Sequence, residues 1–157
     1  MRAITIREDR SGLSVTADLL EDRAPANTDF LWAFLHQVRE IPAIHAMWTG
    51  PEISAPIPDA SLTEPLRRAL PLENATITPQ PGEIVLTYLP PRVWGGGPAP
   101  VFDIGLFYGP GARLFFPIGW QPGSVVARVA DVPALAAACA RSRQSGACTL
   151  GFARAEP

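Results

Sequence analysis

The sequence predicts a mostly β protein in which antiparallel strands close into a barrel and two helices cover its ends. Many short strand-like segments follow one another, and the turns between them contain glycine and proline. Only two stretches place apolar residues at helical spacing. A parallel sheet needs a crossover helix between successive strands, so two helices are too few for it and a barrel or sandwich is favoured.

The chain opens with a predicted hairpin. Ile4 and Ile6 alternate with polar residues, and residues 13–19 alternate between apolar and polar in the same way. The polar turn between the two runs ends in Gly12. The alternation predicts two antiparallel strands with one face turned to solvent.

The first helix is predicted to follow this hairpin. Apolar residues in the segment 30–38 fall at helical spacing, and either Asn27 or Thr28 is expected to cap the first turn. The helix is expected to end near Glu40, because Pro42 disfavours helical geometry in the residue before it.

The middle of the chain reads as strands separated by proline-rich and glycine-rich turns. A third strand is expected over residues 43–49, and residues 52–72 are expected to be mostly loop, because the region contains four prolines and follows another. A short helical turn is expected within residues 62–70. Five further strand-like segments follow, namely residues 75–78, 83–89, 101–108, 113–118 and 124–129.

The second helix and a last strand are predicted at the end of the sequence. Asp131 is suited to cap a helix over residues 132–144, Pro133 fits its first turn, and Gly146 can end it. Residues 147–152 then read as a final strand. The whole chain of 157 residues is expected to form one domain.

Composition and charge exclude several classes of function. The formal net charge is −2, which offers no broad basic face to nucleic acid or to anionic lipid. All 13 positively charged residues are arginine. A chain without lysine cannot form a Schiff base, use a lysine general base or build a P-loop.

The ends and the cysteines suggest a reducing compartment. The segment 1–6 is too short and too quickly charged for a signal peptide, and no apolar run approaches the ~20 residues that span a bilayer. We therefore expect a cytoplasmic protein without membrane partners. Cys139 and Cys148 fall in the second helix and the last strand, where reduced, buried thiols are expected.

Two stretches of the chain resemble a known fold family. Residues 15–25 followed by residues 27–31 resemble the cyclophilin pattern of a strand, an acidic-Ala-Pro turn and a helix opening with Asn and Phe. Residues 71–76 with residues 79–84, and also residues 45–50, resemble the DUF3830 group of small bacterial proteins of unknown function, which are cyclophilin-like. The resemblance implies a cyclophilin-like closed antiparallel β-barrel with two α-helices, and it is silent on activity.

The chain departs from cyclophilins at their isomerase site. That site resembles a Phe-His-Arg strand, in which the arginine donates hydrogen bonds that help to twist the proline amide. The comparable strand here reads Ile44-His45-Ala46, which puts Ala46 at the arginine position. Without that donor, classical prolyl isomerase activity is not expected.

Three residues stand out as candidates for chemistry, each with a structural alternative. His45 lies beside Trp48 and is either a base or ligand hydrogen-bonder, or a half-buried histidine satisfied by backbone. Asp103 interrupts an apolar strand and is either an acid or base, or a residue that faces water or pairs with Arg113. Trp94, beside three glycines, either covers a pocket, contacts a partner subunit or packs within its loop.

A metal site and a cofactor are not predicted. His36 and His45 are separated by nine positions, and no cysteine or further histidine falls at ligand spacing. The candidate ligand-binding residues are His45, Met47, Trp48, Trp94, Asp103, Arg113, Phe116 and Trp120.

The sequence therefore leads first to a module that binds a small molecule or a peptide, without classical prolyl isomerase activity. An enzyme with an acid–base reaction that uses His45 or Asp103 is one alternative. An accessory or structural subunit, whose exposed aromatic residues form an interface, is another and leaves a homo-oligomer open. A peptidyl-prolyl cis-trans isomerase is the last.

Overall fold

The computed structural model describes residues 1–156, and two α-helices and eleven β-strands lie in that range. The helices are α1 (Pro25–Phe34) and α2 (Val132–Ser145). The strands are β1 (Ala3–Glu8), β2 (Leu13–Leu19), β3 (Arg39–His45), β4 (Glu52–Pro56), β5 (Ala75–Thr76), β6 (Glu83–Leu89), β7 (Val101–Phe107), β8 (Phe115–Phe116), β9 (Gly119–Trp120), β10 (Gly123–Val129) and β11 (Cys148–Arg154).

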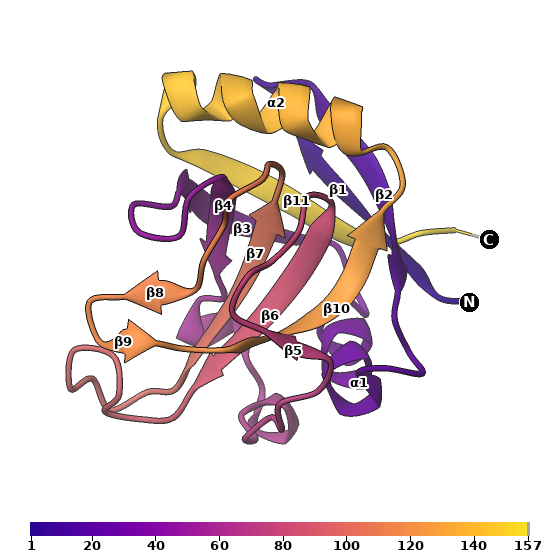
Figure 1. The fold of residues 1–157 in the computed structure, drawn as a ribbon. Coiled ribbons are helices and arrows are strands. Elements are labelled where there is room, and N and C mark those ends of the chain that lie inside the picture. The colour runs from indigo at the N-terminus through magenta and orange to yellow at the C-terminus, as the bar shows by residue number, and fades with distance from the viewer. Residues whose placement is uncertain (157) are drawn as a thin grey trace.

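Eight of the strands described for residues 1–156 close into an antiparallel barrel. Their order is β2-β1-β11-β3-β4-β7-β6-β10, and β10 pairs back onto β2 through Ala127 opposite Leu19 (Figure 1). The short strand β5 adds to β10 beside this closure, and β8 and β9 form a separate hairpin. The closed, mostly β architecture with two helices confirms the predicted cyclophilin-like fold class.

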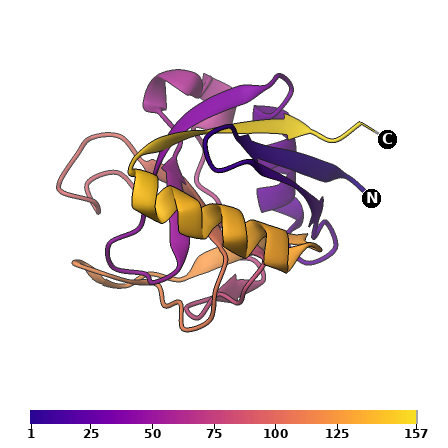
Figure 2. The same cartoon turned by 90° about the horizontal axis from the view of Figure 1, so that it is seen from above.

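The two helices cover opposite ends of the barrel. Figure 1 shows α2 across one end and α1 at the other, and Figure 2 shows α2 lying over the barrel seen from above. From α1, the Phe30 ring stacks on Phe102 of β7 with 5.0 Å between centroids, and both side chains are fully buried. From α2, Leu135 and Cys139 enter the same core. The helices therefore complete the apolar interior that the strands leave open at each end.

The first helix begins and ends earlier than predicted. Ala24 is its N-cap and Pro25 its first residue, so Asn27 and Thr28 lie inside the helix and do not cap it. The Asn27 side-chain amide instead donates to the Pro71 carbonyl at 3.0 Å and to a carboxylate further along the same segment. Asn27 thus anchors the proline-rich excursion to the helix.

The third strand also lies earlier than the predicted residues 43–49. The helix stops at Phe34 and β3 runs over Arg39–His45, with Pro42 opposite Thr149 of β11. Val38, which completed the predicted helical stripe, is 68% exposed. Val38 therefore fitted the helical spacing of apolar residues without being buried, and the helix is shorter than that spacing indicated.

The segment predicted to be loop contains a barrel strand. Residues 52–56 form β4, which pairs with β7 along its whole length. Ile53 and Ala55 point into the core, while Pro56 closes the strand at its end. Two 3₁₀ turns follow, over Asp59–Ser61 and Glu64–Leu66, partly within the region where a helical turn was expected.

The remaining predicted strands differ in how far they form. Strands β6, β7, β10 and β11 and helix α2 agree with the predicted ranges to within two residues. The predicted strands over 75–78 and 113–118 are reduced to two residues each, Ala75–Thr76 and Phe115–Phe116. Since β7 takes β4 and β6 as its neighbours, residues 113–118 have no place in the barrel.

Asp131 caps α2 as predicted, and removing the cap should destabilise the protein. Its side chain accepts a hydrogen bond from the Ala134 amide at 3.0 Å. We expect Asp131→Ala to lower the melting temperature by roughly 2–4 °C, because a lost N-cap costs about 1 kcal/mol. Asp22→Ala, in an exposed turn, is the control for loss of one charge. Equal melting temperatures for both variants in a thermal scan would contradict the capping role.

Two further features of the described chain bear on its environment. Cys139 and Cys148 are free and buried, and burial raises the pKa of the Cys139 thiol to about 12. In residues 1–156, neither helix combines the length and the apolar character that a membrane crossing requires.

Candidate functional site

A cavity of about 360 Å³ lies on the outer face of the barrel, over β4, β7 and β6. Side chains alternate between the two faces of a strand, so the neighbours of the buried core residues Ile53, Phe102 and Ile104 point outward into this cavity. We call it the carboxyl pocket. Its lining residues are Ile44, Ala46, Met47, Trp48, Thr49, Glu52, Ser54, Pro56, Thr87, Leu89, Trp94, Val101, Asp103 and Phe116.

Two carboxyl groups lie at the floor of the carboxyl pocket. Glu52 on β4 is only 4% exposed, and Asp103 on β7 is half-buried. The Ser54 hydroxyl donates to Asp103 Oδ1 at 2.7 Å, and the Thr49 hydroxyl donates to Glu52 Oε2. Among residues 1–156, no group donates a hydrogen bond to Glu52 Oε1 or Asp103 Oδ2, so each carboxyl keeps one oxygen for the cavity.

A glycine makes room for the Glu52 carboxyl. Gly105 on β7 lies opposite Ser54 on β4, and a Cβ added there would overlap Glu52 Oε1. The same Cβ would lie 2.9 Å from the Phe107 ring. The Glu52 carboxyl therefore lies over Gly105. Gly105 is two residues from Asp103 along β7, so the two carboxyl groups lie on the same face of the sheet.

Burial raises the pKa of both carboxyl groups. Desolvation, and next the negative charge of Asp103, raise the pKa of Glu52 from 4.5 to about 8, against the Thr49 hydrogen bond. Desolvation raises the pKa of Asp103 from 3.8 to about 6, against the Ser54 hydrogen bond. Two neighbouring carboxylates disfavour double ionisation, so near neutral pH the pair shares about one proton and carries about one negative charge.

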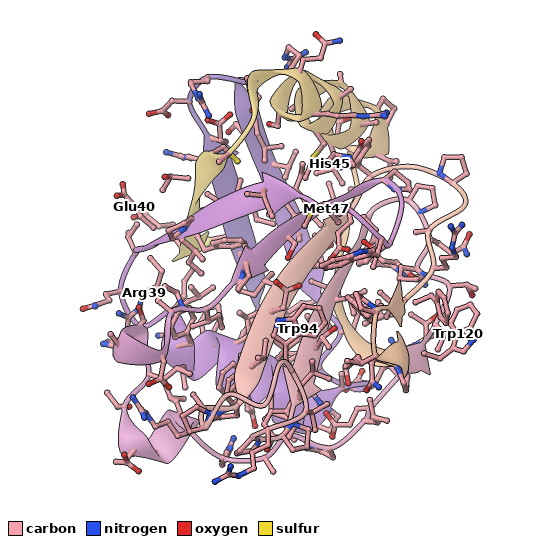
Figure 3. The ribbon with its side chains drawn as sticks, turned by 90° about the vertical axis from the view of Figure 1, so that its left-hand side faces the viewer. Arg39, Glu40, His45, Met47, Trp94 and Trp120 are labelled. Carbon is pink, nitrogen blue, oxygen red and sulfur yellow. The ribbon has the colours of Figure 1, made fainter. Side chains whose placement is uncertain are left out.

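Three aromatic side chains form one wall of the carboxyl pocket. Trp94 stands edge-to-face with Trp48, with 5.7 Å between centroids, and with Phe116, at 6.1 Å. It comes from the glycine-rich loop between β6 and β7, which is closed by a 2.7 Å hydrogen bond from the Arg92 amide to the Gly97 carbonyl. Figure 3 shows Trp94 on the same side of the molecule as Met47. The pocket thus combines an aromatic wall with an acidic floor.

With this geometry, comparison with known proteins identifies the family. The model of a family described as "Protein of unknown function (DUF3830)" matches residues 4–154. The chain belongs to this family. No curated protein sequence matches it.

Two solved structures share the fold of this DUF3830 chain. McbB in complex with tryptophan superposes with a TM-score of 0.70 at 19% sequence identity, and the match covers 98% of this chain and 45% of McbB. This chain therefore spans less than half of McbB. The hypothetical protein AF2241 from Archaeoglobus fulgidus superposes with a TM-score of 0.53 at 18% identity, covering 98% of this chain and 95% of AF2241. At these identities the likeness establishes the fold alone.

Five of the eight predicted site residues line the carboxyl pocket, namely Met47, Trp48, Trp94, Asp103 and Phe116. His45 is not among the lining residues. Its Nε2 is 2.7 Å from the Tyr108 hydroxyl, and its Nδ1 is 2.9 Å from the Ala46 carbonyl. Both ring nitrogens therefore have partners within the fold, on the other face of the strand from Ile44 and Ala46.

Arg113 and Trp120 also lie outside the lining of the pocket. Pairing of Asp103 with Arg113, one of the alternatives that the sequence left open, is wrong: among residues 1–156, Asp103 forms no ion pair and its hydrogen-bond partner is Ser54. The reason is topological, since Asp103 lies between two barrel strands that do not include residue 113. Trp120 is 52% exposed and packs on Phe115 at 4.9 Å, and Figure 3 shows it far from Trp94.

Glu52 and Ser54 were not predicted as site residues, because the prolines around them indicated a loop; Thr49 ended a predicted strand and carried no signal of its role. The alternation of Glu52 and Ser54 with the apolar Ile53 and Ala55 was the signal that could have predicted a strand with one polar face. Two carboxyls and two hydroxyls are few ligands for a metal ion. Within the described part of the chain, no three His, Cys, Asp or Glu side chains gather as a metal site would require.

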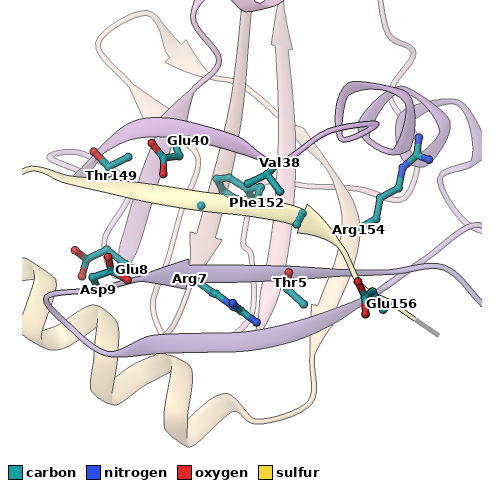
Figure 4. Close-up of a pocket in the computed structure, with 12 residues that line it drawn as sticks. Thr5, Arg7, Glu8, Asp9, Val38, Glu40, Thr149, Phe152, Arg154 and Glu156 are labelled. Carbon is teal, nitrogen blue, oxygen red and sulfur yellow. The ribbon is translucent and has the colours of Figure 1, made fainter.

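A second and larger cavity, of about 690 Å³, is a groove over β1, β11 and β3 (Figure 4). It presents both signs of charge, with Arg7 and Arg154 beside Glu40 and Glu156. Most of these side chains are exposed, so water screens their charges and each charged contact would contribute little to binding. The carboxyl pocket is the stronger candidate, because its ionisable groups are desolvated and its walls are apolar.

Proposed function

We propose that this chain binds a small organic molecule in the carboxyl pocket. The observation that carries the proposal is an aromatic-walled cavity of about 360 Å³ whose floor holds Glu52 and Asp103 with free carboxyl oxygens. Ligand sites are typically about 300–1,000 Å³, mostly apolar, and fitted with a few polar groups that orient the ligand. The carboxyl pocket matches that description.

Stability does not account for the two carboxyl groups. A buried charge without a counter-charge destabilises a fold, and a neutral side chain of similar size would be better tolerated there. Glu52 and Asp103 form no ion pair within residues 1–156, although the chain carries 13 arginines. A bound molecule that uses the free oxygens would explain their presence.

McbB supports the choice of the first probes. It shares the fold of this chain and was solved with tryptophan, an aromatic molecule with an amino group. The wall of Trp48, Trp94 and Phe116 suits an aromatic ligand by stacking or edge contact. Indole and phenyl compounds are therefore the natural first panel.

Trp94→Ala should weaken binding of any ligand that the pocket holds. We expect a loss of about tenfold or more in affinity, because the ligand loses its largest aromatic contact. Trp120→Ala is the matched control, since it removes an exposed tryptophan that does not line the pocket. Binding would be measured by thermal shift and by titration calorimetry. A loss in the Trp120 variant but not in the Trp94 variant would move the site to the β8–β9 hairpin.

A second candidate function is acid–base catalysis in the same pocket. It is favoured by one protonated and one ionised carboxyl side by side, with the pKa of Glu52 raised to about 8 and that of Asp103 to about 6. Such a pair can donate and accept a proton near neutral pH. If a bound probe exchanges a carbon-bound proton for deuterium in heavy water, and Asp103→Asn abolishes the exchange, this candidate would replace simple binding.

An accessory or structural role is favoured by exposed apolar side chains at the pocket and on the β8–β9 hairpin. Met47 is 71% exposed, Phe115 46% and Trp120 52%, and such patches often contact other proteins or a second copy. Sedimentation of Phe115→Ser beside the wild type would detect a self-association that depends on this patch. Prolyl isomerase activity is not proposed: Ala46 lines the pocket, and no arginine is among the residues described as lining it.

A further inference from the structure

We infer that the ligand is an organic cation, with an ammonium group held by Glu52 and Asp103 and an apolar body held by Trp48, Trp94 and Phe116. This inference rests on the proposed function and specifies its ligand class. It follows from three properties of the carboxyl pocket: the sign of its charge, the number of its free acceptors and the nature of its wall.

The pocket is acidic, with no basic side chain among its described lining residues. The ion pairs of residues 1–156 use Glu8, Glu21, Asp29, Asp59 and Glu83, so the arginines serve other carboxylates. The negative charge of Asp103 raises the pKa of Glu52, so the two carboxyls lie close enough together to disfavour a second charge. A singly charged cation would complete this site, whereas an anion would be repelled.

The free acceptors suit an ammonium group. Glu52 is more than nine-tenths buried, and its Oε1 accepts no hydrogen bond from residues 1–156; the same holds for Asp103 Oδ2. An ammonium offers up to three N–H donors and no acceptor. Asp103 Oδ2 can take one donor, and Glu52 Oε1 can take a second, because a protonated carboxyl keeps acceptor capacity beside its O–H group. The hydroxyl oxygen of Ser54 or Thr49, which also line the pocket, is available for a third.

The wall favours an organic cation over a metal ion. Hard metal cations take about six to eight oxygen ligands, whereas the floor offers two carboxyls and two hydroxyls. Leu89, Val101 and Phe116 line the same pocket and offer no oxygen, nitrogen or sulfur side-chain atom as a further ligand. Aromatic faces attract organic ammonium groups and cover the hydrocarbon beside them. The occupant is therefore a cation with an apolar body.

The test compares molecules with the same aromatic body and polar groups of different charge. Tryptamine is compared with tryptophol, its neutral alcohol counterpart, and with indole-3-acetate; phenethylamine is compared with 2-phenylethanol. We expect each amine to bind roughly tenfold or more tightly than its alcohol, because it alone makes charge-assisted hydrogen bonds to the floor. The carboxylate should bind least. Titration calorimetry at millimolar probe concentrations is the readout.

Two variants connect the preference to the floor. Asp103→Asn should bring the affinity for tryptamine down to that for tryptophol and leave the affinity for tryptophol nearly unchanged. Asp22→Asn removes one negative charge from an exposed turn and should preserve the preference. Trp94→Ala should weaken amine and alcohol alike.

The affinity for the amines should also rise with pH between about 5 and 7. Glu52 is the single titratable group that faces Asp103 among the lining residues; β6, the loop with Trp48 and Thr49, the Trp94 loop and β8 contribute none. As the pH rises through about 6, the carboxyl pair loses its first proton and gains the charge that the ammonium binds, while the amines keep theirs. Asp103→Asn should flatten this dependence.

The outcomes separate this inference from the proposed function. If the alcohols bind as tightly as the amines and Trp94→Ala weakens both, the pocket is a ligand site and the cation inference is wrong. If calcium or magnesium binds and the amines do not, the cation inference is also wrong. If no indole or phenyl probe binds to the wild type, both fail.

Discussion

Glu52→Gln should raise the melting temperature by on the order of 10 °C at about pH 8.5 and by much less at pH 5. The pKa of Glu52 is about 8 in the fold and 4.5 ordinarily, so between these values the native state holds a proton that the unfolded chain releases. The free energy of unfolding therefore falls as the pH rises from about 4.5 to about 8. Each tenfold change in proton affinity is worth about 1.4 kcal/mol, so the full effect is on the order of several kcal/mol.

The glutamine variant does not lose stability in this way, because its side chain has a similar shape but cannot ionise. Asp103→Asn should behave in the same direction with a smaller effect, since the pKa of Asp103 is raised from 3.8 to about 6. Thermal scans should stay below about pH 9, because the buried thiols Cys139 and Cys148 have raised pKa values and add their own loss of stability above it. Glu40→Gln, on an exposed site, is the control. If the Glu52 variant and the wild type have equal melting temperatures at both pH values, burial of Glu52 does not destabilise the fold.

Gly105→Ala should lower the melting temperature by roughly 2–12 °C, because overpacking typically costs about 1–3 kcal/mol. The new Cβ would overlap the Glu52 carboxyl and lie 2.9 Å from the Phe107 ring, between strands that cannot separate in a closed barrel. Gly97→Ala is the matched control, because the contact nearest to its Cβ is an ordinary 3.6 Å. Its expected effect is within about 0.5 kcal/mol.

A double variant identifies which contact matters. If displacement of Glu52 is the main cost, Glu52→Ala should relieve most of the damage from Gly105→Ala, and the two changes should be less than additive. If the Phe107 ring dominates, the two costs should add. The Gly105 variant should also lose the preference for amines over alcohols, because its Cβ occupies the place of the Glu52 carboxyl.

Much of the fold could be predicted where local pattern and burial agree. The hairpin of β1 and β2 and the strands β6, β7 and β10 have apolar residues that enter the core directly. Helix α2 has a strong start and end signal in Asp131 and Gly146. The failures occur where local signals conflict with tertiary pairing. Val38 fitted a helical stripe but is exposed, and β4 forms despite Pro56 because β7 needs a neighbour on that side.

The candidate site was predictable only in part for the same reason. Trp94 and Asp103 stood out because an aromatic among glycines and a carboxylate within an apolar strand are locally unusual. Glu52 is not unusual in its own segment, and its position against Asp103 depends on the pairing of β4 with β7. Nothing local marks Gly105 as the residue that admits a carboxyl.

By itself, the sequence determined the class of fold, the family and the exclusion of lysine chemistry, because periodicity, turn residues and composition are properties of neighbours along the chain. The tertiary structure alone decided which carboxyl groups share a pocket, which histidine is satisfied elsewhere and which aromatic side chains face them. These contacts form between residues that are distant in sequence, such as Ser54 and Asp103, which are 49 positions apart. They exist only once the barrel has closed.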